Sequence, residues 1–392
     1  MRNKTYLWLS VVISLYALAS VAEAQEEQWL RYRSAREARQ ILGNIGLQQV
    51  ELSNDRPVGM ELPQFNSESP LFGKLFTPMV ESGHIWISLD RSNKNGLYDR
   101  LFIDSDGDGH LKDETIVAAY RTDQYRSDFG PVKVVFEVED GPVTYHLNFE
   151  FSNYNDRNRL FATSGGWYEG AITVGGQRKN CLLIDQNANG TFNDKSLNSN
   201  ECDRIRIGEK DTAKTSFVGN YIVVDAVLYQ PEIARDGAYI KLTVAEDVVY
   251  GAVRLPETIS EFAAKGENGL FTLTPEKKLA RLPVGKYRVH SWKTERKDDK
   301  GNTWSLTGQE FGNKGLFEVN ESDQTTLDIG EPIISTLTAR ESDSRYSFSQ
   351  NMRGRLGERI ELTRNGSQPR APKLNIKNND GSYDRTFSFE YG

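Results

Sequence analysis

Most of the chain after residue 83 consists of short runs in which apolar and polar residues alternate, separated by turn residues. Two such runs span 132–151, with a turn cluster at 139–142 between them. The run 171–174 leads into Gly175-Gly176, which favours a tight hairpin because both glycines can adopt positive φ. Many short strands with frequent turns are typical of sandwiches and barrels. The chain is therefore predicted to be mainly β.

Helical patterns are rare. Ser34-Ala35-Arg36-Glu37 fits a capping box, in which the serine hydroxyl and the Glu37 carboxylate satisfy the first free backbone N–H groups of a helix. Gly43 is placed to end that helix. The stretch 259–264 could form one more short helix. We expect one short helix near the N-terminus and little helix elsewhere.

Composition bounds the function. The 392 residues suggest two or three domains, and 38% hydrophobic residues fit a globular protein. With 48 basic against 55 acidic residues, the chain lacks the positive charge that nucleic-acid binding requires. Four histidines and two cysteines are too few for a zinc ribbon or an iron–sulfur site.

The first 24 residues read as a signal peptide. Arg2 and Lys4 precede a largely apolar stretch over 6–21, and Ala22-Glu23-Ala24 fits a cleavage site. A membrane anchor is the alternative, although the stretch is shorter than a span needs. No later segment is apolar enough to span a membrane once the signal is removed. We expect an extracytoplasmic protein, secreted or periplasmic.

An oxidising compartment favours a disulfide between Cys181 and Cys202. The alternative is a pair of buried free thiols. Beyond the signal peptide, composition suggests four segments: 25–78 with the helix and an extended connection, 79–246 as a β domain, and the segments 247–332 and 333–392.

The run Leu282-Pro283-Val284-Gly285-Lys286-Tyr287 resembles a segment of small carboxypeptidase-regulatory-like or prealbumin-like β-sandwich modules. The resemblance implies an Ig-like sandwich over 247–332. The tail 333–392 is either a second Ig-like module or the closing strands of the first.

Acidic residues alternate in the stretch that follows the apolar run ending at Ile103. Asp104, Asp106 and Asp108 take positions 1, 3 and 5 of a tight loop, so their carboxylates can converge on one cation. Gly109 permits the turn, and His110 offers its backbone carbonyl. Additional candidate ligands follow at the end of the loop: Asp113 and Glu114.

A second copy of this pattern begins 81 residues later. Asp185, Asn187 and Asn189 occupy positions 1, 3 and 5, Thr191 matches His110, and Asp194 matches Asp113. This copy carries less negative charge, so we expect weaker ion binding. For both loops the alternative is a plain turn, because Asp, Asn and Gly favour turns by themselves.

These stretches resemble the calcium loops of EF-hands, dockerins and thrombospondin type 3 repeats. The resemblance implies Ca²⁺ as the ion. It covers the loops alone, because Thr115 stands where the EF-hand has its bidentate glutamate and no helices are predicted on either side.

No catalytic pattern stands out: no nucleophile elbow and no phosphate-binding glycine loop occur. We expect an exported, calcium-stabilised, non-catalytic protein that binds a glycan or protein ligand or organises the cell envelope. One alternative is a glycan-directed hydrolase with structural calcium. Another is a carbohydrate-binding protein, in which Trp167 and Tyr168 are the aromatic residues expected to be exposed. The sequence leaves the oligomeric state open.

Overall fold

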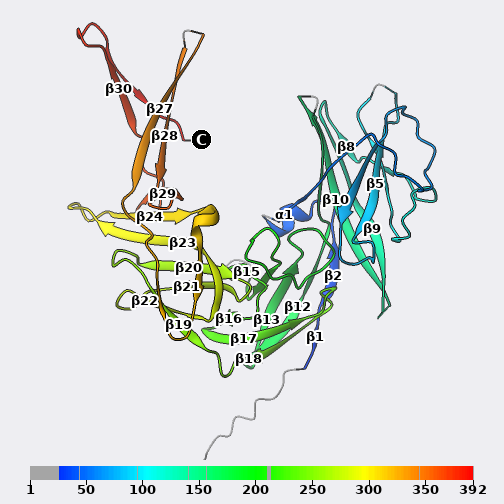
Figure 1. Cartoon of the computed structure of the whole chain (residues 1–392), viewed down its shortest axis with the longest axis horizontal. Coiled ribbons are helices and arrows are strands. Elements are labelled where there is room, and N and C mark those ends of the chain that lie inside the picture. Colours follow the sequence, from blue (N-terminus) through cyan, green and yellow to red (C-terminus); the bar gives the residue numbers. More distant parts are fainter. Residues whose placement is uncertain are drawn as a thin grey trace, which may run out of the picture.

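The computed structural model describes residues 26–391 apart from 44, 95, 140, 156, 210–212 and 344, so the predicted signal peptide lies outside the described residues. The described chain is mainly β, with many antiparallel sheets and almost no helix, as predicted. It is consistent with a β-sandwich-type protein. Figure 1 shows two arms, one holding β5, β9 and β10 and the other β27, β28 and β30, with the green strands β12–β18 between them.

The first arm contains two sheets. One has the order β3 (Gln48–Val50), β11 (Arg157–Ser164), β10 (Gly141–Tyr154), β9 (Arg126–Val138) and β8 (Arg121–Thr122). The other has the order β4 (Leu71–Phe76), β5 (His84–Asp90), β6 (Arg100–Ile103) and β7 (Val117–Ala118). Strand β4 lies inside the segment that was expected to be only an extended connection.

Two further sheets form the middle of the molecule. One has the order β15 (Ser216–Phe217), β14 (Arg204–Ile207), β13 (Gln177–Ile184), β12 (Gly166–Val174) and β2 (Arg31–Ser34). The other has the order β1 (Gln28–Trp29), β18 (Tyr239–Val244), β17 (Val227–Ile233) and β16 (Ile222–Val224). The predicted hairpin joins β12 to β13, with φ of +57° at Gly175 and +75° at Gly176.

The remaining sheets follow residue 249. One has the order β22 (Leu279–Pro283), β19 (Tyr250–Arg254) and β26 (Gln324–Thr326). The largest has the order β21 (Gly269–Leu273), β20 (Glu261–Gly266), β23 (Gly285–Lys297), β24 (Thr303–Gln309), β29 (Arg359–Arg364), β28 (Arg345–Arg353) and β27 (Ile334–Ser342), and β25 (Leu316–Val319) also pairs with β23. Strands β30 (Lys373–Lys377) and β31 (Asp384–Ser388) form a separate hairpin, and a short 3-10 helix, η1, spans Gly312–Gly315.

Buried side chains form two large cores. One collects residues from Leu30 to Leu242 and the other from Val253 to Ile360. A small third cluster contains Ala38, Trp167 and Ile184. Strands β27, β28, β30 and β31 hold no buried residue. Strand β29 pairs with β24, so β27–β29 continue the preceding sheet, whereas β30 and β31 do not join it.

Two of the expected helices need correction. The helix α1 covers only Ala38–Leu42; Ser34 is the last residue of β2, and Glu37 caps the helix without a side-chain hydrogen bond. The expected capping box is therefore wrong, because the pairing of β2 with β12 extends to Ser34. The stretch predicted as a second helix belongs largely to β20, whose residues pair with β21 and β23 on either side.

Candidate metal centre and neighbouring sites

Both acidic loops begin where a buried strand ends. Strand β6 ends at Ile103 and β13 ends at Ile184, and the next residue in each case is a buried aspartate, Asp104 or Asp185. The backbone N–H of Asp104 still donates to the Trp86 carbonyl, at 2.9 Å. Each aspartate is thus fixed at a sheet end before the chain turns.

The two loops share one backbone conformation. Position 4 has positive φ in both, +77° at Gly107 and +56° at Ala188, and position 6 has +85° at Gly109 and +91° at Gly190. This left-handed geometry is strained for alanine, so Ala188 keeps it only because its surroundings enforce it. The recurrence confirms that the pattern is a repeated structural unit and not only a repeated spacing.

Hydrogen bonds and core contacts repeat as well. The N–H at position 6 donates to the first aspartate, from Gly109 to Asp104 Oδ2 at 3.1 Å and from Gly190 to Asp185 Oδ2 at 2.8 Å. The residue at position 8 is buried in both loops, as Leu111 and Phe192.

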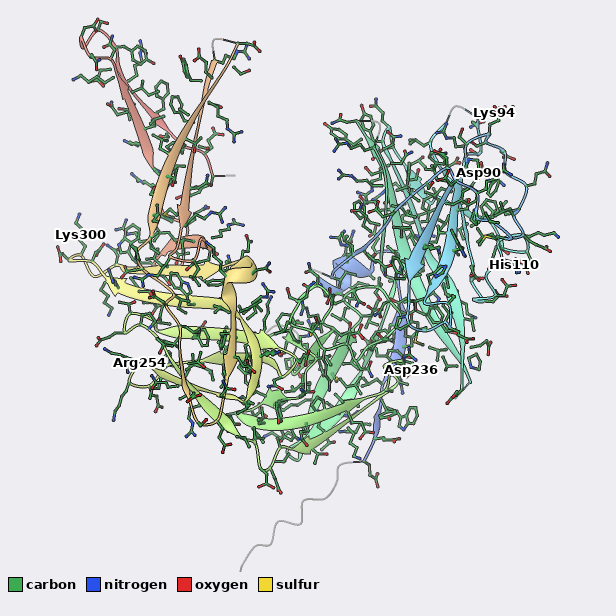
Figure 2. All side chains as sticks on the ribbon, viewed as in Figure 1. Asp90, Lys94, His110, Asp236, Arg254 and Lys300 are labelled. Atoms are coloured by element: carbon green, nitrogen blue, oxygen red, sulfur yellow. The ribbon has the colours of Figure 1, made fainter. Side chains whose placement is uncertain are left out.

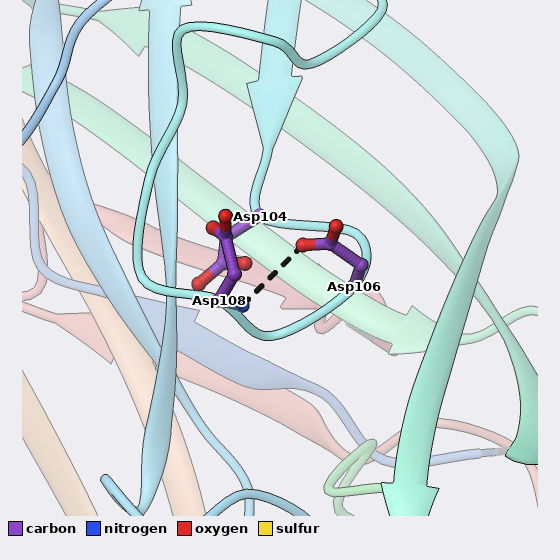
Figure 3. A group of neighbouring side chains, drawn as sticks. All are labelled: Asp104, Asp106 and Asp108. Carbon is purple, nitrogen blue, oxygen red and sulfur yellow. Dashed lines mark hydrogen bonds between the residues drawn. The ribbon is translucent and has the colours of Figure 1, made fainter.

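In the first loop three carboxylates converge. Asp104, Asp106 and Asp108 each offer an oxygen within 4.8 Å of the others (Figure 3). The N–H of Asp108 donates to Asp106 Oδ1 at 3.3 Å, and the N–H of His110 donates to Asp108 Oδ1 at 2.7 Å. Asp106 and Asp108 are exposed, so an ion can reach the cluster from solvent. These three residues could hold a metal ion.

Asp104 is the residue that most needs a partner. Its side chain is 1% exposed, and its Oδ1 atom is buried without a hydrogen-bond donor. The pKa of Asp104 is raised to about 6: burial is the main cause, Asp108 and Asp106 act in the same direction, and the N–H groups of Gly109 and Gly107 act against it. A buried carboxylate oxygen without a donor is destabilising unless a proton or a cation compensates it.

The other predicted ligands of this loop have different roles. Glu114 binds the second loop residue: it accepts from the Ser105 N–H and from the Ser105 hydroxyl, the latter at 2.8 Å. Burial raises the pKa of Glu114. Asp113 is exposed and lies outside the convergent group. His110 Nδ1 accepts from the Glu61 N–H at 3.2 Å, which commits its ring to holding a neighbouring segment.

That neighbouring segment packs over the loop through Glu61. Its carbonyl accepts from the Leu111 N–H at 3.1 Å, and its carboxylate pairs with Lys112 at 2.7 Å. Further along, the buried carboxylate of Asp90 receives the N–H groups of Asn66 and Ser67, both at 2.9 Å. Asp90 and His110 lie in the same arm, far from Arg254 (Figure 2). The loop thus helps to hold the connection before β4.

The second loop satisfies its first aspartate with protein donors. Asp185 Oδ2 accepts from the Tyr145 hydroxyl at 2.6 Å and from Gly190, while Oδ1 accepts from the Asn187 N–H at 3.1 Å. Asp185 and Tyr145 are both buried. Burial raises the pKa of Asp185 to about 6, although Tyr145 and Gly190 lower it.

The asparagines of this loop also act as donors. Asn187 and Asn189 both donate through Nδ2 to Asp194 Oδ2, at 3.1 and 2.7 Å. The hydroxyl and the N–H of Thr191 donate to Asn189 Oδ1, at 2.7 and 2.9 Å. Oδ1 of Asn187 is buried without a donor. At positions 3 and 5 the second loop therefore has amide N–H donors, where Asp106 and Asp108 of the first loop offer only acceptors.

The sequence did not reveal Asp203, which completes the second loop. Its fully buried carboxylate accepts from the Gln186 N–H at 3.0 Å and from the Asp194 N–H at 2.8 Å. Burial, with Asp185 and Asp194 close by, raises its pKa well above the usual range. Asp203 accepts from the N–H at loop position 2, just as Glu114 does in the first loop. Because Asp203 lies far along the chain from the loop, the sequence pattern did not mark it.

The predicted disulfide is not formed: Cys181 and Cys202 are buried free thiols. Strand register explains the error, because Cys181 lies opposite Ile207 while the paired segment of β14 begins at Arg204. The three steps from Ile207 to Arg204 span about 10 Å along the strand, and Cys202 lies beyond Arg204, whereas a disulfide needs Cα atoms within about 7 Å. The Cys202 thiol instead contacts the Val218 carbonyl at 3.2 Å.

The aromatic prediction is also corrected. Trp167 is 6% exposed and Tyr168 8%, and Trp167 donates through Nε1 to Glu169 at 3.0 Å. Among the tryptophans that the structure describes, Trp29 is the exposed one, at 67%. Trp29 borders a cavity of about 610 Å³ on the outer face of the sheet that contains β2.

Arginines surround this cavity, which we call the Trp29 groove. Its lining includes Trp29, Arg31, Arg33, Glu169, Arg178 and Arg206. Register places Arg31, Glu169, Leu182 and Arg206 in one row across four strands. Arg33 pairs with Glu169 at 3.1 Å, whereas Arg31, Arg178 and Arg206 form no ion pair within the described residues.

Comparisons with known proteins add no assignment: no family model, curated protein or solved structure matches the chain. Within the described residues, no helix is long and apolar enough to cross a membrane.

Proposed function

We propose that the chain is an exported, non-catalytic binding or cell-envelope protein whose first acidic loop binds Ca²⁺. One observation carries the calcium assignment: three carboxylates lie close together, and one of them, Asp104, has a buried oxygen without a donor. Ca²⁺ is a hard cation that takes six to eight oxygen ligands, and carboxylates in a short loop provide both oxygens and charge. Nitrogen and sulfur ligands, which zinc prefers, are absent from the described cluster.

The ion would stabilise structure. It would neutralise three like charges packed into five residues, and it would order the loop that receives the Glu61 segment. The extracellular space and the periplasm are the compartments in which weak calcium sites are used in this way. The predicted signal peptide points to the same location.

Calorimetric titration of the mature chain tests the site. Calcium chloride should bind with favourable free energy and magnesium chloride should bind more weakly, because Mg²⁺ demands octahedral geometry and gives up its waters reluctantly. The double variant Asp104→Ala/Asp106→Ala should lose the binding. Asp113→Asn, which changes an exposed acid outside the cluster, should retain it. Equal calcium binding by the double variant would refute the assignment.

The Trp29 groove supports a second function, binding of an acidic carbohydrate. An exposed indole gives a flat apolar surface on which a sugar ring can stack, and unpaired arginines donate bidentate hydrogen bonds to carboxylate or sulfate groups. The groove lining holds four arginines against two glutamates, Glu169 and Glu209, so it is locally basic in a chain whose net charge is −7.

Affinity electrophoresis on acidic and neutral polysaccharides tests this function. Trp29→Ala should abolish retardation by the acidic polymers, while Tyr154→Ala, which removes another exposed aromatic ring, should not change it. Retardation that is equal for both variants would exclude the groove. Release of shorter glycans in the same samples would instead favour a hydrolase.

A further inference from the structure

A second cluster of basic side chains lies where the two large cores meet. Lys265 on β20 and Arg288 and His290 on β23 line a cavity of about 520 Å³. Asn198 and Ser199, from the loop before β14, line its other side. The cavity, which we call the interface cavity, therefore takes residues from both halves of the chain.

Arg204 contacts this cavity wall but does not itself line the cavity. Its Nη2 donates to the Ser199 carbonyl at 2.6 Å, while its Nη1 is buried without any acceptor. The guanidinium carbon lies 3.7 Å from the centroid of the Phe217 ring. The same ring has the Lys265 ammonium at 5.7 Å and the His290 ring edge-on at 5.7 Å. Phe217 thus brings three basic side chains together.

Among the described residues no carboxylate forms an ion pair with these groups, although burial lowers the pKa of Arg204 and Asp203 partly offsets that lowering. Arg204, Lys265, Arg288 and His290 form no ion pair within 4.0 Å among the described residues. Glu310 is the acid that lines the interface cavity, and it is exposed and pairs with Arg359 at 3.6 Å. Partly buried cations without counter-ions are unusual, because protein interiors normally pair them.

Protonation equilibria agree with this geometry. Burial, together with Arg204 and Arg288, lowers the pKa of Lys265 to about 8. Burial, together with Lys265 and Arg204, lowers the pKa of His290 to about 4. The basic groups therefore disfavour one another's charged forms, and an anion placed among them would relieve that repulsion.

We propose that the interface cavity binds an oxyanion, a phosphate or sulfate group that is either free or esterified to a small molecule. Lys265 supplies an ammonium with three donors and Arg288 a planar guanidinium, the two side chains that proteins use for such anions. The cavity volume lies within the range of small-molecule sites, so it has room for an ester larger than the anion alone. Binding would link the two halves of the chain, because the cavity wall takes residues from both.

Thermal unfolding and calorimetric titration test the proposal with inorganic phosphate, sulfate and a sugar phosphate, each at constant ionic strength with chloride as the reference anion. At least one oxyanion should raise the unfolding temperature above the chloride value. Free phosphate or sulfate binding as tightly as the ester would identify the anion itself as the ligand, and tighter binding of the ester would identify an ester. The titrations are run in EDTA, so they do not depend on the calcium site.

Lys265→Met should weaken oxyanion binding at least tenfold, whereas Lys373→Met, which removes an exposed lysine on β30, should leave it unchanged. In the unmutated protein, saturating oxyanion should also raise the pKa of His290, measured by NMR of the imidazole, which keeps the test valid if Lys265→Met fails to fold. The proposal is overturned if no oxyanion stabilises the protein beyond chloride, if the two variants bind equally, or if the His290 pKa does not move.

Discussion

The substitution Asp104→Asn separates the ion from the loop geometry. Asparagine keeps the size of the side chain and can still accept the Gly109 N–H, while its amide replaces the buried Oδ1 that has no donor. It also imitates the second loop, in which amide N–H groups donate to a carboxylate. The structure therefore predicts that this substitution stabilises the chain without calcium and weakens the stabilisation that calcium gives.

Without calcium the variant should be more stable than the wild type. The pKa of Asp104 rises from 3.8 to about 6 in the folded chain, so at pH 7.5 the ionised side chain opposes folding. A shift of that size corresponds to about 3 kcal/mol as an upper limit. Solvent around the exposed Asp106 and Asp108 screens the charge, so the expected effect lies between about 1 kcal/mol and that limit. Each kcal/mol raises the unfolding temperature of a domain of this size by about 2–4 °C.

With calcium the advantage of the variant should shrink. A wild-type site at a calcium concentration about a hundred times its Kd gains about 2.7 kcal/mol, and the variant should lose about 1.4 kcal/mol or more of that gain because one charged ligand is gone. Thermal unfolding in EDTA and in millimolar calcium measures both effects. Asp113→Asn serves as the control and should match the wild type in both buffers. A variant that is less stable in EDTA, or that responds fully to calcium, would refute the reasoning.

Three more predictions follow from buried groups outside this loop. Because burial raises the pKa of the Cys181 thiol to about 12 and Cys202 is also buried, both cysteines should react with a thiol reagent only after unfolding, and reductant should leave the unfolding temperature unchanged. Burial, together with Lys265 and Arg204, lowers the pKa of His290 to about 4, so between pH 6.5 and 4 the unfolded chain binds a proton that the folded chain does not, and stability falls as the pH drops. The denaturant midpoints at pH 7 and pH 5 should therefore differ less for His290→Gln than for the wild type. An equal difference would contradict this. Trp292→Phe should destabilise the second core by about 2–4 kcal/mol in urea unfolding, because Trp292 Nε1 donates at 2.9 Å to the fully buried Glu358, whereas Trp304→Phe on the neighbouring strand should cost less.

Local sequence signals predicted some local features and missed others. The Gly175-Gly176 turn and the acidic loops follow from backbone preferences within a few residues, and the structure contains them. The helix expected over 259–264 failed because tertiary pairing outweighs a weak local preference: the strand formed there is flanked by partners on both sides.

Features that depend on strand register could not be read from the sequence. The separation of Cys181 from Cys202 follows from which residues of β13 and β14 face each other. The burial of Trp167 depends on α1 and β13 packing over it. Lys265 and Arg204 meet at the Phe217 ring across 60 intervening residues, and neither residue stands in a pattern that would mark it.

The two acidic loops show that an identical turn can carry unequal chemistry. Both place a buried aspartate at a strand end and bend at the same two positions, so geometry alone does not distinguish them. They differ in how the first aspartate is balanced: Asp185 receives the Tyr145 hydroxyl and lies among asparagine amides, whereas Asp104 keeps an oxygen without a donor beside two exposed acids. The buried second loop therefore has its donors built in, and the first must obtain its positive charge from solution. That asymmetry is why we assign the ion to Asp104 and its neighbours, although the sequence pattern pointed to both loops.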